Sequence, residues 1–245
     1  MVTLAPSLTE TVLALGAGDR LVGVSRFDEL PEVAALPRVG GFIDPSIEAV
    51  VALAPDLVLV QPAPGNKQPV EKMADLGVPV LAVPMHSLAS TVAAIREVGR
   101  ALGLSPRAEA LVKEIETARA NIRAQARGRR PLRVLFVVGF EPLVVAGTRS
   151  FAAELLSDCG ATNAAEGTTA AFSVYSVESA VRSRPDVVLD AANVSAGREK
   201  IESLPGLREA RWVKVSSEDL LHPGPKLATG MAELFRLLYP GDAGR

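Results

Sequence analysis

The sequence is poor in the residues that make disulfides, base-stacking surfaces and basic patches. It has a single cysteine, Cys159, so no disulfide can form within the chain, which fits any cellular compartment. Aromatic residues make up 4% of the chain, too few for the stacking platforms that bind single-stranded nucleic acid. The formal net charge of −2 also argues against the clustered basic face of a nucleic-acid-binding protein. We therefore expect no nucleic-acid partner.

Metal-binding and catalytic motifs are also missing. The two histidines, His86 and His222, have no further metal-ligating residue at a useful spacing, whereas a zinc site usually needs three or four ligands. The chain has no G-x-S-x-G elbow and no G-x-x-x-x-G-K-[ST] phosphate loop. "GAGDRL" at 16–21 lacks the third glycine of a dinucleotide fingerprint and follows a helical pattern. We predict no catalytic residue, no metal site and no cofactor, which favours a binding protein over an enzyme.

Long apolar runs are absent too. No run reaches the roughly 18 apolar residues that a transmembrane helix needs. The opening "MVTLAPSLTE" shows neither the basic region nor the apolar core of an export signal. The sequence thus allows a cytoplasmic protein or an exported one whose signal, and any lipid anchor, lies upstream of Met1.

What the chain does have is enough apolar sequence for two cores. It contains 245 residues, 48% of them apolar. That length suits two domains of about 100 to 120 residues each.

A short phrase occurs twice, which points to two domains of similar construction. "SIEAVVALAPDLVLV" occupies residues 46–60, and "SVESAVRSRPDVVLD" occupies 176–190. Ser46 and Ser176 predict helix N-caps, and the residue before each proline is expected to end the helix. The apolar runs that follow are typical of strands buried on both faces of a parallel sheet. Each copy therefore predicts a helix, a tight turn and a buried strand.

Further helix starts and strands follow the same alternation. Ser7 and Glu10 have the spacing of a capping box, and Ser150 is a candidate N-cap before "FAAELLSDCG". Alternation of strands with helices predicts parallel sheets. The predicted strands are residues 2–5, 21–24, 57–61, 79–83, 133–138, 143–146, 186–190 and 212–215.

A long helical pattern separates the two halves. "LSPRAEALVKEIETARANIRAQARG" carries one apolar stripe, with Ser105 as a candidate cap, Pro106 at a first helical position and Gly128 as a stop. About 22 helical residues would span roughly 33 Å. We predict an α/β fold with an N-terminal lobe (1–104), one long rigid bridging helix (105–127) and a C-terminal lobe (128–245). Each lobe would have a central, mostly parallel sheet flanked by helices. The alternative is a crossover helix on one continuous sheet.

The order of motifs along the chain carries a further signal. The first 60 residues contain "SLTE", "RFDELP", "VGGF" and "APDLVLV", and the second half has "FSVYSVESAVRSRPDVVL" and "HPGPKLATGMAELFRLLYP". This set resembles the cobalamin-, haem- and siderophore-binding solute receptors of ABC importers, the class III or helical-backbone type, with the cobalamin-binding branch nearest. The resemblance covers nearly the whole chain. It implies two α/β lobes joined by a long helix, with the ligand held between them.

The resemblance also implies ligand-binding positions at the ends of strands, where open α/β sheets commonly bind ligands. Pro6 and Ser7 are equally explained as a helix start. Three phenylalanines of the set, Phe27, Phe42 and Phe172, could instead belong to a core. Arg26 could be a solvated surface charge or could meet a carboxylate or phosphate of the ligand. His86 could form structural hydrogen bonds or coordinate the chelated metal. The implied positions are Pro6, Ser7, Arg26, Phe27, Asp28, Gly41, Phe42, Gln61, Pro62, His86, Gly139, Phe140, Phe172, His222 and Pro223.

Two departures from the family pattern concern the identity of the ligand. Gln61 and Pro62 stand where cobalamin receptors carry an aromatic residue, and Phe27 in "RFDELP" replaces the usual tyrosine of the "Y-x-DYP" loop. The binding surface is therefore less aromatic than in those receptors. The expected ligand is a corrinoid or another large metal chelate. The alternatives are haem, with His86 or Tyr175 as axial ligand, a ferric siderophore, or a cytoplasmic α/β enzyme or chelate-handling protein with the same fold.

The resemblance finally implies a membrane partner. Receptors of this type dock on an ABC permease through one surface carboxylate per lobe, each of which meets arginines. Glu202 in "GREKIESLPG" lies at the expected position of the second lobe, with Glu199 beside it. In the first lobe Gln68 stands near the expected position and Glu71 is the nearest carboxylate. We therefore expect a monomeric, extracytoplasmic protein, periplasmic or membrane-anchored, that delivers its ligand to a permease.

Overall fold

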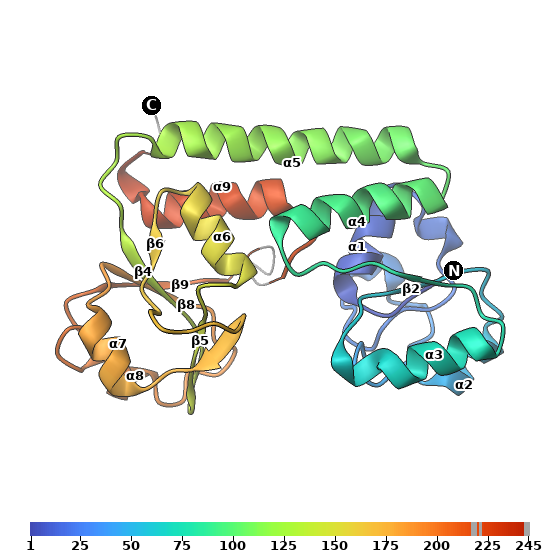
Figure 1. Ribbon diagram of the computed structural model, residues 1–245, viewed down its shortest axis with the longest axis horizontal. Coiled ribbons are helices and arrows are strands. Elements are labelled where there is room, and N and C mark those ends of the chain that lie inside the picture. The colour runs from blue at the N-terminus through green and yellow to red at the C-terminus, as the bar shows by residue number, and fades with distance from the viewer. Residues whose placement is uncertain (217–219, 221, 243–245) are drawn as a thin grey trace. The chain divides into compact units, whose positions relative to one another are not determined.

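The computed structural model describes residues 1–216, 220 and 222–242 of the chain. The chain divides into two compact units, residues 1–113 and 114–245, and the boundary falls inside helix α5 (Ser105–Ala126) (Figure 1). Each unit has its own sheet.

The first unit contains a three-stranded parallel sheet in the order β1-β2-β3. The strands are β1 (Val2–Thr3), β2 (Val58–Val60) and β3 (Val80–Ala82). Val2 pairs with Val58, which pairs in turn with Val80. All three residues of β2 are buried, because helices cover both faces of the sheet, and this explains the uninterrupted apolar sequence of the strand.

Four helices and three short 3-10 turns surround this sheet. Helices α1 and α4 lie on one face and α2 and α3 on the other (Figure 1). The core on the α2–α3 face consists of Val2, Leu4, Val39, Val50, Val58, Val60 and Met73. The elements are α1 (Pro6–Ala14), η1 (Gly18–Arg20), η2 (Pro31–Val33), α2 (Ile47–Ala52), η3 (Pro64–Asn66), α3 (Lys67–Asp75) and α4 (Leu88–Ala101).

The second unit contains a six-stranded mixed sheet in the order β7-β5-β4-β8-β9, with β6 also paired to β4. Strand β4 pairs in parallel with β8 and β6, and β8 pairs in parallel with β9. The β4–β5 and β5–β7 pairs are antiparallel. The strands are β4 (Arg133–Phe140), β5 (Leu143–Ala146), β6 (Thr162–Asn163), β7 (Phe172–Val174), β8 (Val187–Asp190) and β9 (Arg211–Lys214).

Helices cover both faces of this second sheet as well. Helices α6 (Phe151–Asp158) and α9 (Leu227–Leu238) pack together on one face, and α7 (Val177–Ser183) and α8 (Arg198–Glu202) lie on the other (Figure 1). A 3-10 turn, Pro240–Asp242, follows α9. The expected α/β class, with a separate sheet in each half, is confirmed. The second sheet is mixed because the β4–β5 hairpin adds an antiparallel edge.

Both copies of the repeated phrase fold as predicted. Ser46 caps α2 and Ser176 caps α7, each accepting a hydrogen bond from the backbone N–H three residues on, at 3.2 Å and 3.0 Å. The residues before the prolines, Ala54 and Arg184, have φ angles of 43° and 39°, which end both helices. Strands β2 and β8 then run through the interior of their units. Local capping and the proline stop therefore define this unit of structure twice.

Three local predictions are wrong. Ser7 does not cap α1, which begins at Pro6 with Ala5 as N-cap. Proline at a first helical position needs no hydrogen-bonded N–H, so the helix starts two residues earlier than expected. Residues 21–24 form only isolated bridges, and the predicted strand is missing. Helix α5 begins at Ser105 itself, so this serine is not the cap.

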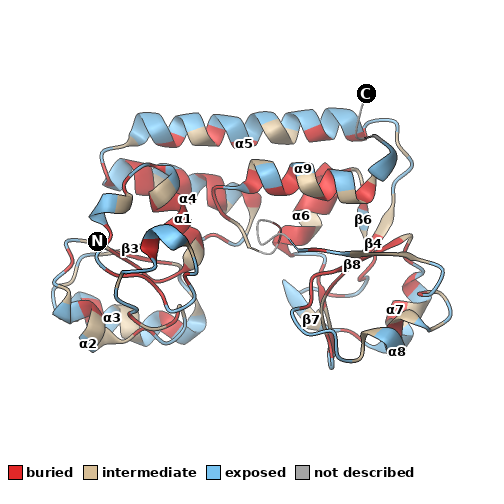
Figure 2. Cartoon of the chain, turned by 180° about the vertical axis from the view of Figure 1, so that it is seen from behind, coloured by how far each residue is buried: buried red, intermediate tan, exposed pale blue. Residues whose placement is uncertain are grey.

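Helix α5 is a single helix of 22 residues, and the predicted stripe faces inward. Ala108, Val112, Ile115 and Ile122 are buried, and most of the remaining surface of α5 is exposed (Figure 2). Gly128, with a φ of 77°, follows its end as expected. The rigid bridging role of this helix stays a prediction.

Cys159 is a buried structural residue at the end of α6. Burial, assisted by the nearby charge of Asp158, raises the pKa of the thiol to about 12. The thiol is therefore protonated at neutral pH and cannot act as a nucleophile.

Among the described helices, none is both long and apolar enough to cross a bilayer.

Candidate functional site

The candidate ligand site of the first unit is a group of four loops, residues 25–28, 40–44, 61–66 and 85–87, here called the loop cluster. The segments at 61–66 and 85–87 follow β2 and β3, so they emerge at the carboxyl edge of the parallel sheet. Hydrogen bonds join the loops directly: Arg26 N–H donates to the Gly40 carbonyl at 2.8 Å, and Gln61 Nε2 donates to the Met85 carbonyl at 2.7 Å.

Asn66 connects two of these loops. Its side chain is 1% exposed. Its Nδ2 donates to the carbonyls of Phe42 and Gln61, both at 2.8 Å, and its Oδ1 accepts from Ala63 N–H at 2.9 Å. Both N–H donors and the oxygen of the amide are thus used within the cluster. The side chain therefore fixes the spacing of the loops that would meet a ligand.

Arg26 and Phe27 form the exposed surface of the cluster. Arg26 Nη2 lies 2.9 Å from both carboxylate oxygens of Asp44, and its guanidinium carbon lies 5.0 Å from the centroid of the Phe27 ring. The Phe27 ring is 54% exposed and lies outside the core. A Cβ at Gly41 would collide with the Asp44 carboxylate and touch the Phe27 ring. Glycine at position 41 thus leaves room for this arrangement.

Asp28 lies beneath this surface. It is 3% exposed, and Ser25 Oγ donates to its Oδ2 at 2.6 Å. Ser25 Oγ also accepts from Phe27 N–H at 3.3 Å. Asp28 Oδ1 is buried without a hydrogen-bond partner among the described residues. The carboxylate therefore supports the loop that carries Phe27, and a direct contact between Asp28 and a ligand stays a prediction.

The other predicted positions of the first unit differ in exposure. Pro6 is half-buried at the start of α1, whereas Ser7 is buried inside that helix. Gln61 is half-buried, and Pro62 and His86 are exposed. Phe42, half-buried, presents its carbonyl to Asn66. All of them except Phe42, which lies in the loop before α2, follow the ends of the parallel strands.

In the second unit the predicted residues do not behave alike. Phe140, expected at the ligand, is 4% exposed and stacks on Trp212 with ring centroids 6.2 Å apart, so it belongs to the core of this unit. Phe172, at the edge of the sheet in β7, is 55% exposed. His222 is half-buried, with Nδ1 buried and unpartnered among the described residues. Gly139 and Pro223 are half-buried.

Tyr175, named above as a possible axial ligand, is 8% exposed. Burial raises the pKa of its hydroxyl, and the nearby charge of Glu166 raises it further. A tyrosine coordinates ferric iron as the phenolate, which this environment disfavours.

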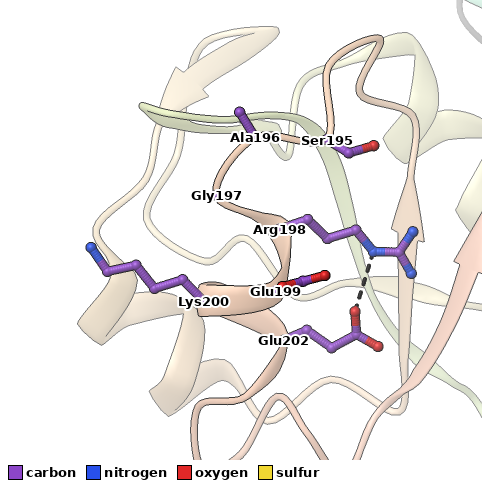
Figure 3. A pocket seen from close by; sticks show the side chains of 7 residues that line it. All are labelled: Ser195, Ala196, Gly197, Arg198, Glu199, Lys200 and Glu202. Carbon is purple, nitrogen blue, oxygen red and sulfur yellow. Dashed lines mark hydrogen bonds and ion pairs between the residues drawn. The ribbon is translucent and has the colours of Figure 1, made fainter.

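A second candidate surface surrounds α8. Residues 195–200 and Glu202 line a hollow of about 600 Å³. Figure 3 shows Arg198 and Glu202 on the same side of the short helix, joined by an ion pair, with Lys200 directed away from them. Glu202, one of the two proposed docking acids, is 39% exposed. Glu71, the other, lies on α3, is 60% exposed and lies 3.8 Å from Lys67 Nζ.

Sequence reasoning missed four residues that organise these sites: Asp44, Asn66, Asp190 and Arg198. A signal existed for Asp190. The first copy of the repeated phrase ends in Val60 and the second in Asp190, and a carboxylate in a strand that is otherwise apolar needs a partner. Within the described part of the chain, no group of three or more His, Cys, Asp or Glu side chains is arranged to hold a metal ion.

The sequence matches a known protein family and several of its members. The model of the family described as periplasmic binding protein matches residues 1–214. The uncharacterized ABC transporter substrate-binding lipoprotein YvrC of Bacillus subtilis is 30% identical over 254 residues, which cover 98% of this chain and 80% of that protein. The vitamin B12-binding protein of Vibrio parahaemolyticus is 22% identical over 239 residues, or 96% of this chain and 87% of that one.

Solved structures share the fold. The periplasmic heme-binding protein RhuT from Roseiflexus sp. RS-1, in its apo form, superposes with a TM-score of 0.85 at 28% sequence identity. The superposition covers 98% of this chain and 97% of RhuT. The similarity therefore extends over both units and includes the loop cluster.

Proposed function

Because the chain belongs to the periplasmic binding protein family, we propose that it captures a corrinoid or a closely related metal chelate for an ABC importer. The family consists of transport components that bind a solute without transforming it, so the enzyme considered above does not fit. Relatives of this chain are described as binding vitamin B12 or haem, and both ligands are large, flat metal chelates.

The observation that carries the proposal is that the one arginine on the exposed surface of the loop cluster, Arg26, is already paired with a carboxylate. Arg26 is the cation beside the exposed Phe27 ring, and Asp44 already neutralises it through contacts with both carboxylate oxygens. A flat apolar ring beside a balanced ion pair suits a macrocycle that carries neutral amide groups, as corrinoids do. Haem carries propionate carboxylates, which would have to compete with Asp44 for Arg26.

Haem is the second candidate, and His86 is the residue that favours it. The His86 side chain is exposed in the loop cluster, just before the start of α4. A neutral imidazole is a common ligand of haem iron. This makes His86 a better axial ligand than Tyr175, whose raised pKa disfavours the phenolate.

Calorimetric titration tests the proposal. The purified chain is titrated with cyanocobalamin, with cobinamide, with hemin and with a ferric siderophore. We expect one corrinoid to bind per chain with a dissociation constant of about 1 μM or lower. Arg26→Met is expected to leave the affinity for corrinoid within about threefold of wild type, because Arg26 is already paired with Asp44.

Each other outcome has a defined meaning. If only hemin binds, with a Soret band that is lost in His86→Ala, the second candidate replaces the first. If none of the four ligands releases heat or changes the absorption spectrum, the ligand class itself is wrong.

The proposal includes a membrane partner and a location. The family works with ABC permeases, and we propose that Glu202 and Glu71 are the docking carboxylates of the two units. Both side chains reach solvent and lie on helices, which suits a surface that must be recognised. We also propose that the protein acts outside the cytoplasmic membrane, as its relatives named periplasmic or lipoprotein do.

A further inference from the structure

Asp190 is a carboxylate with no exposure to solvent, at the carboxyl end of β8. Its Oδ1 accepts from Ala192 N–H at 3.1 Å and lies 3.4 Å from Lys214 Nζ. Its Oδ2 lies 3.1 Å from Arg198 Nη1. The contact between Arg198 Nη1 and Asp190 Oδ2 is an ion pair but not a hydrogen bond, since Oδ2 has no hydrogen-bond partner among the described residues. A buried carboxylate that is stabilised in this way holds its cations firmly in place.

Arg198 is the residue that connects this buried charge to the surface. Its side chain is 27% exposed, and its guanidinium carbon lies 5.6 Å from the centroid of the Trp212 ring. Trp212 is itself fixed, because its Nε1 donates to the Leu207 carbonyl at 2.9 Å. The guanidinium is therefore held from one side by Asp190 and along one face by an aromatic ring. Little rotational freedom is left to it.

Glu202 is the outer member of the chain of charges. Arg198 Nε donates to Glu202 Oε2 at 3.2 Å, one helical turn away (Figure 3). Glu202 lines the hollow beside α8, and it makes no other hydrogen bond within the described residues, so Oε1 is free to accept one. Since Asp190 shares the charge of Arg198 from the buried side, the Glu202 carboxylate keeps negative charge for a second cation.

We propose that Asp190 and Arg198 are positioning residues that hold Glu202 in the geometry needed to receive a guanidinium of the permease. This inference rests on the proposed function, in which Glu202 is a docking acid. A carboxylate fixed before docking loses less conformational entropy when it binds, and a fixed orientation favours the bidentate pairing that arginine offers. Glu199, which is exposed on the same helix, is not a partner of Arg198 in the ion pairs of the described residues.

Docking of ligand-free protein on the cognate permease–ATPase complex in nanodiscs tests this inference. Binding is measured by biolayer interferometry for wild type, Arg198→Met, Glu202→Gln and the double variant. Glu199→Gln is the matched control for the loss of a carboxylate on α8. Arg208→Met is the control for the loss of an exposed arginine of the same unit that pairs with a glutamate.

We expect each single variant to weaken docking by about tenfold and the double variant to be no weaker than either, because both act on one contact. The two controls should stay within about twofold of wild type. All the variants should bind the chelate as wild type does. A merely structural role of Arg198 would instead give additive losses together with a lowered melting temperature. Arg198→Lys, which keeps the charge but lacks the Nε donor, should behave like Arg198→Met.

Two results would overturn parts of this account separately. If Arg198→Met and Arg198→Lys both dock as wild type does while Glu202→Gln docks more weakly, Arg198 does not position Glu202. Glu202 would then still be the docking acid. Wild-type docking of Glu202→Gln would show that the docking assignment in the proposed function is itself wrong.

Discussion

Replacing Asn66 with aspartate is expected to lower the stability of the first unit by about 2–4 kcal/mol and the affinity for the chelate by tenfold or more. The wild-type amide donates to two backbone carbonyls, those of Phe42 and Gln61, at 2.8 Å each. An aspartate in this position has no N–H to donate, so its second oxygen would face both carbonyls. The site is 1% exposed, so water has little access to replace the lost hydrogen bonds.

The measurement is urea unfolding followed by circular dichroism, combined with titration of cyanocobalamin. Gln68→Glu is the matched control, since it makes the same amide-to-acid change on the exposed surface of α3, two residues away. That control should change the free energy of unfolding by less than about 0.5 kcal/mol. Equal effects of the two substitutions would show that Asn66 does not organise the loop cluster.

Asp158→Ala is expected to destabilise the second unit by about 2–3 kcal/mol. The Asp158 carboxylate is 4% exposed and accepts from Arg119 Nε at 2.8 Å and from Arg123 Nε at 2.6 Å. It therefore joins α6 to the second half of α5. The arginines left behind are 23% and 55% exposed, so they regain part of their hydration. For that reason the cost is below the loss found when one partner of a fully buried pair is removed.

Trp212 makes this prediction easy to measure. It is the chain's single tryptophan and lies in β9, so its fluorescence during urea unfolding reports on the second unit. Glu178→Ala is the control: it breaks an ion pair with Arg182 in which both side chains are more than two-thirds exposed. Such pairs contribute about 0.5 kcal/mol or less. If the two variants shift the unfolding midpoint equally, the contacts of Asp158 with Arg119 and Arg123 do not stabilise the second unit more than an exposed ion pair does.

The parts of the fold that could be predicted from the sequence are those that local interactions decide. A serine cap and a proline stop act within a few residues, and both copies of the repeated phrase fold accordingly. The apolar stripe of α5 is equally local. The strand predicted at residues 21–24 does not form. A short apolar run containing Gly23 becomes a strand only if a neighbouring strand pairs along its length, and here Gly23 and Val24 form only isolated bridges.

The candidate site likewise divides into parts that local sequence predicts and parts that depend on contacts between distant residues. The loops at strand ends were predictable, because parallel strands place their carboxyl ends at one edge of a sheet. The partners that fix those loops were not. Asp44 meets Arg26 across 18 residues, and Asn66 meets Phe42 across 24, so neither contact leaves a local pattern. Phe140 was misplaced for a related reason: an aromatic residue at a strand end can face either a core or a surface, and Trp212 draws it into the core.

The central claim is that the chelate rests on the loop cluster of the first unit, and hydrogen–deuterium exchange with mass spectrometry tests it directly. Exchange is compared with and without saturating cyanocobalamin. We expect slower exchange in peptides that cover residues 25–28, 40–44 and 61–66, and unchanged exchange in peptides within α6. Protection that leaves these three segments unaffected, or no protection anywhere, would contradict it.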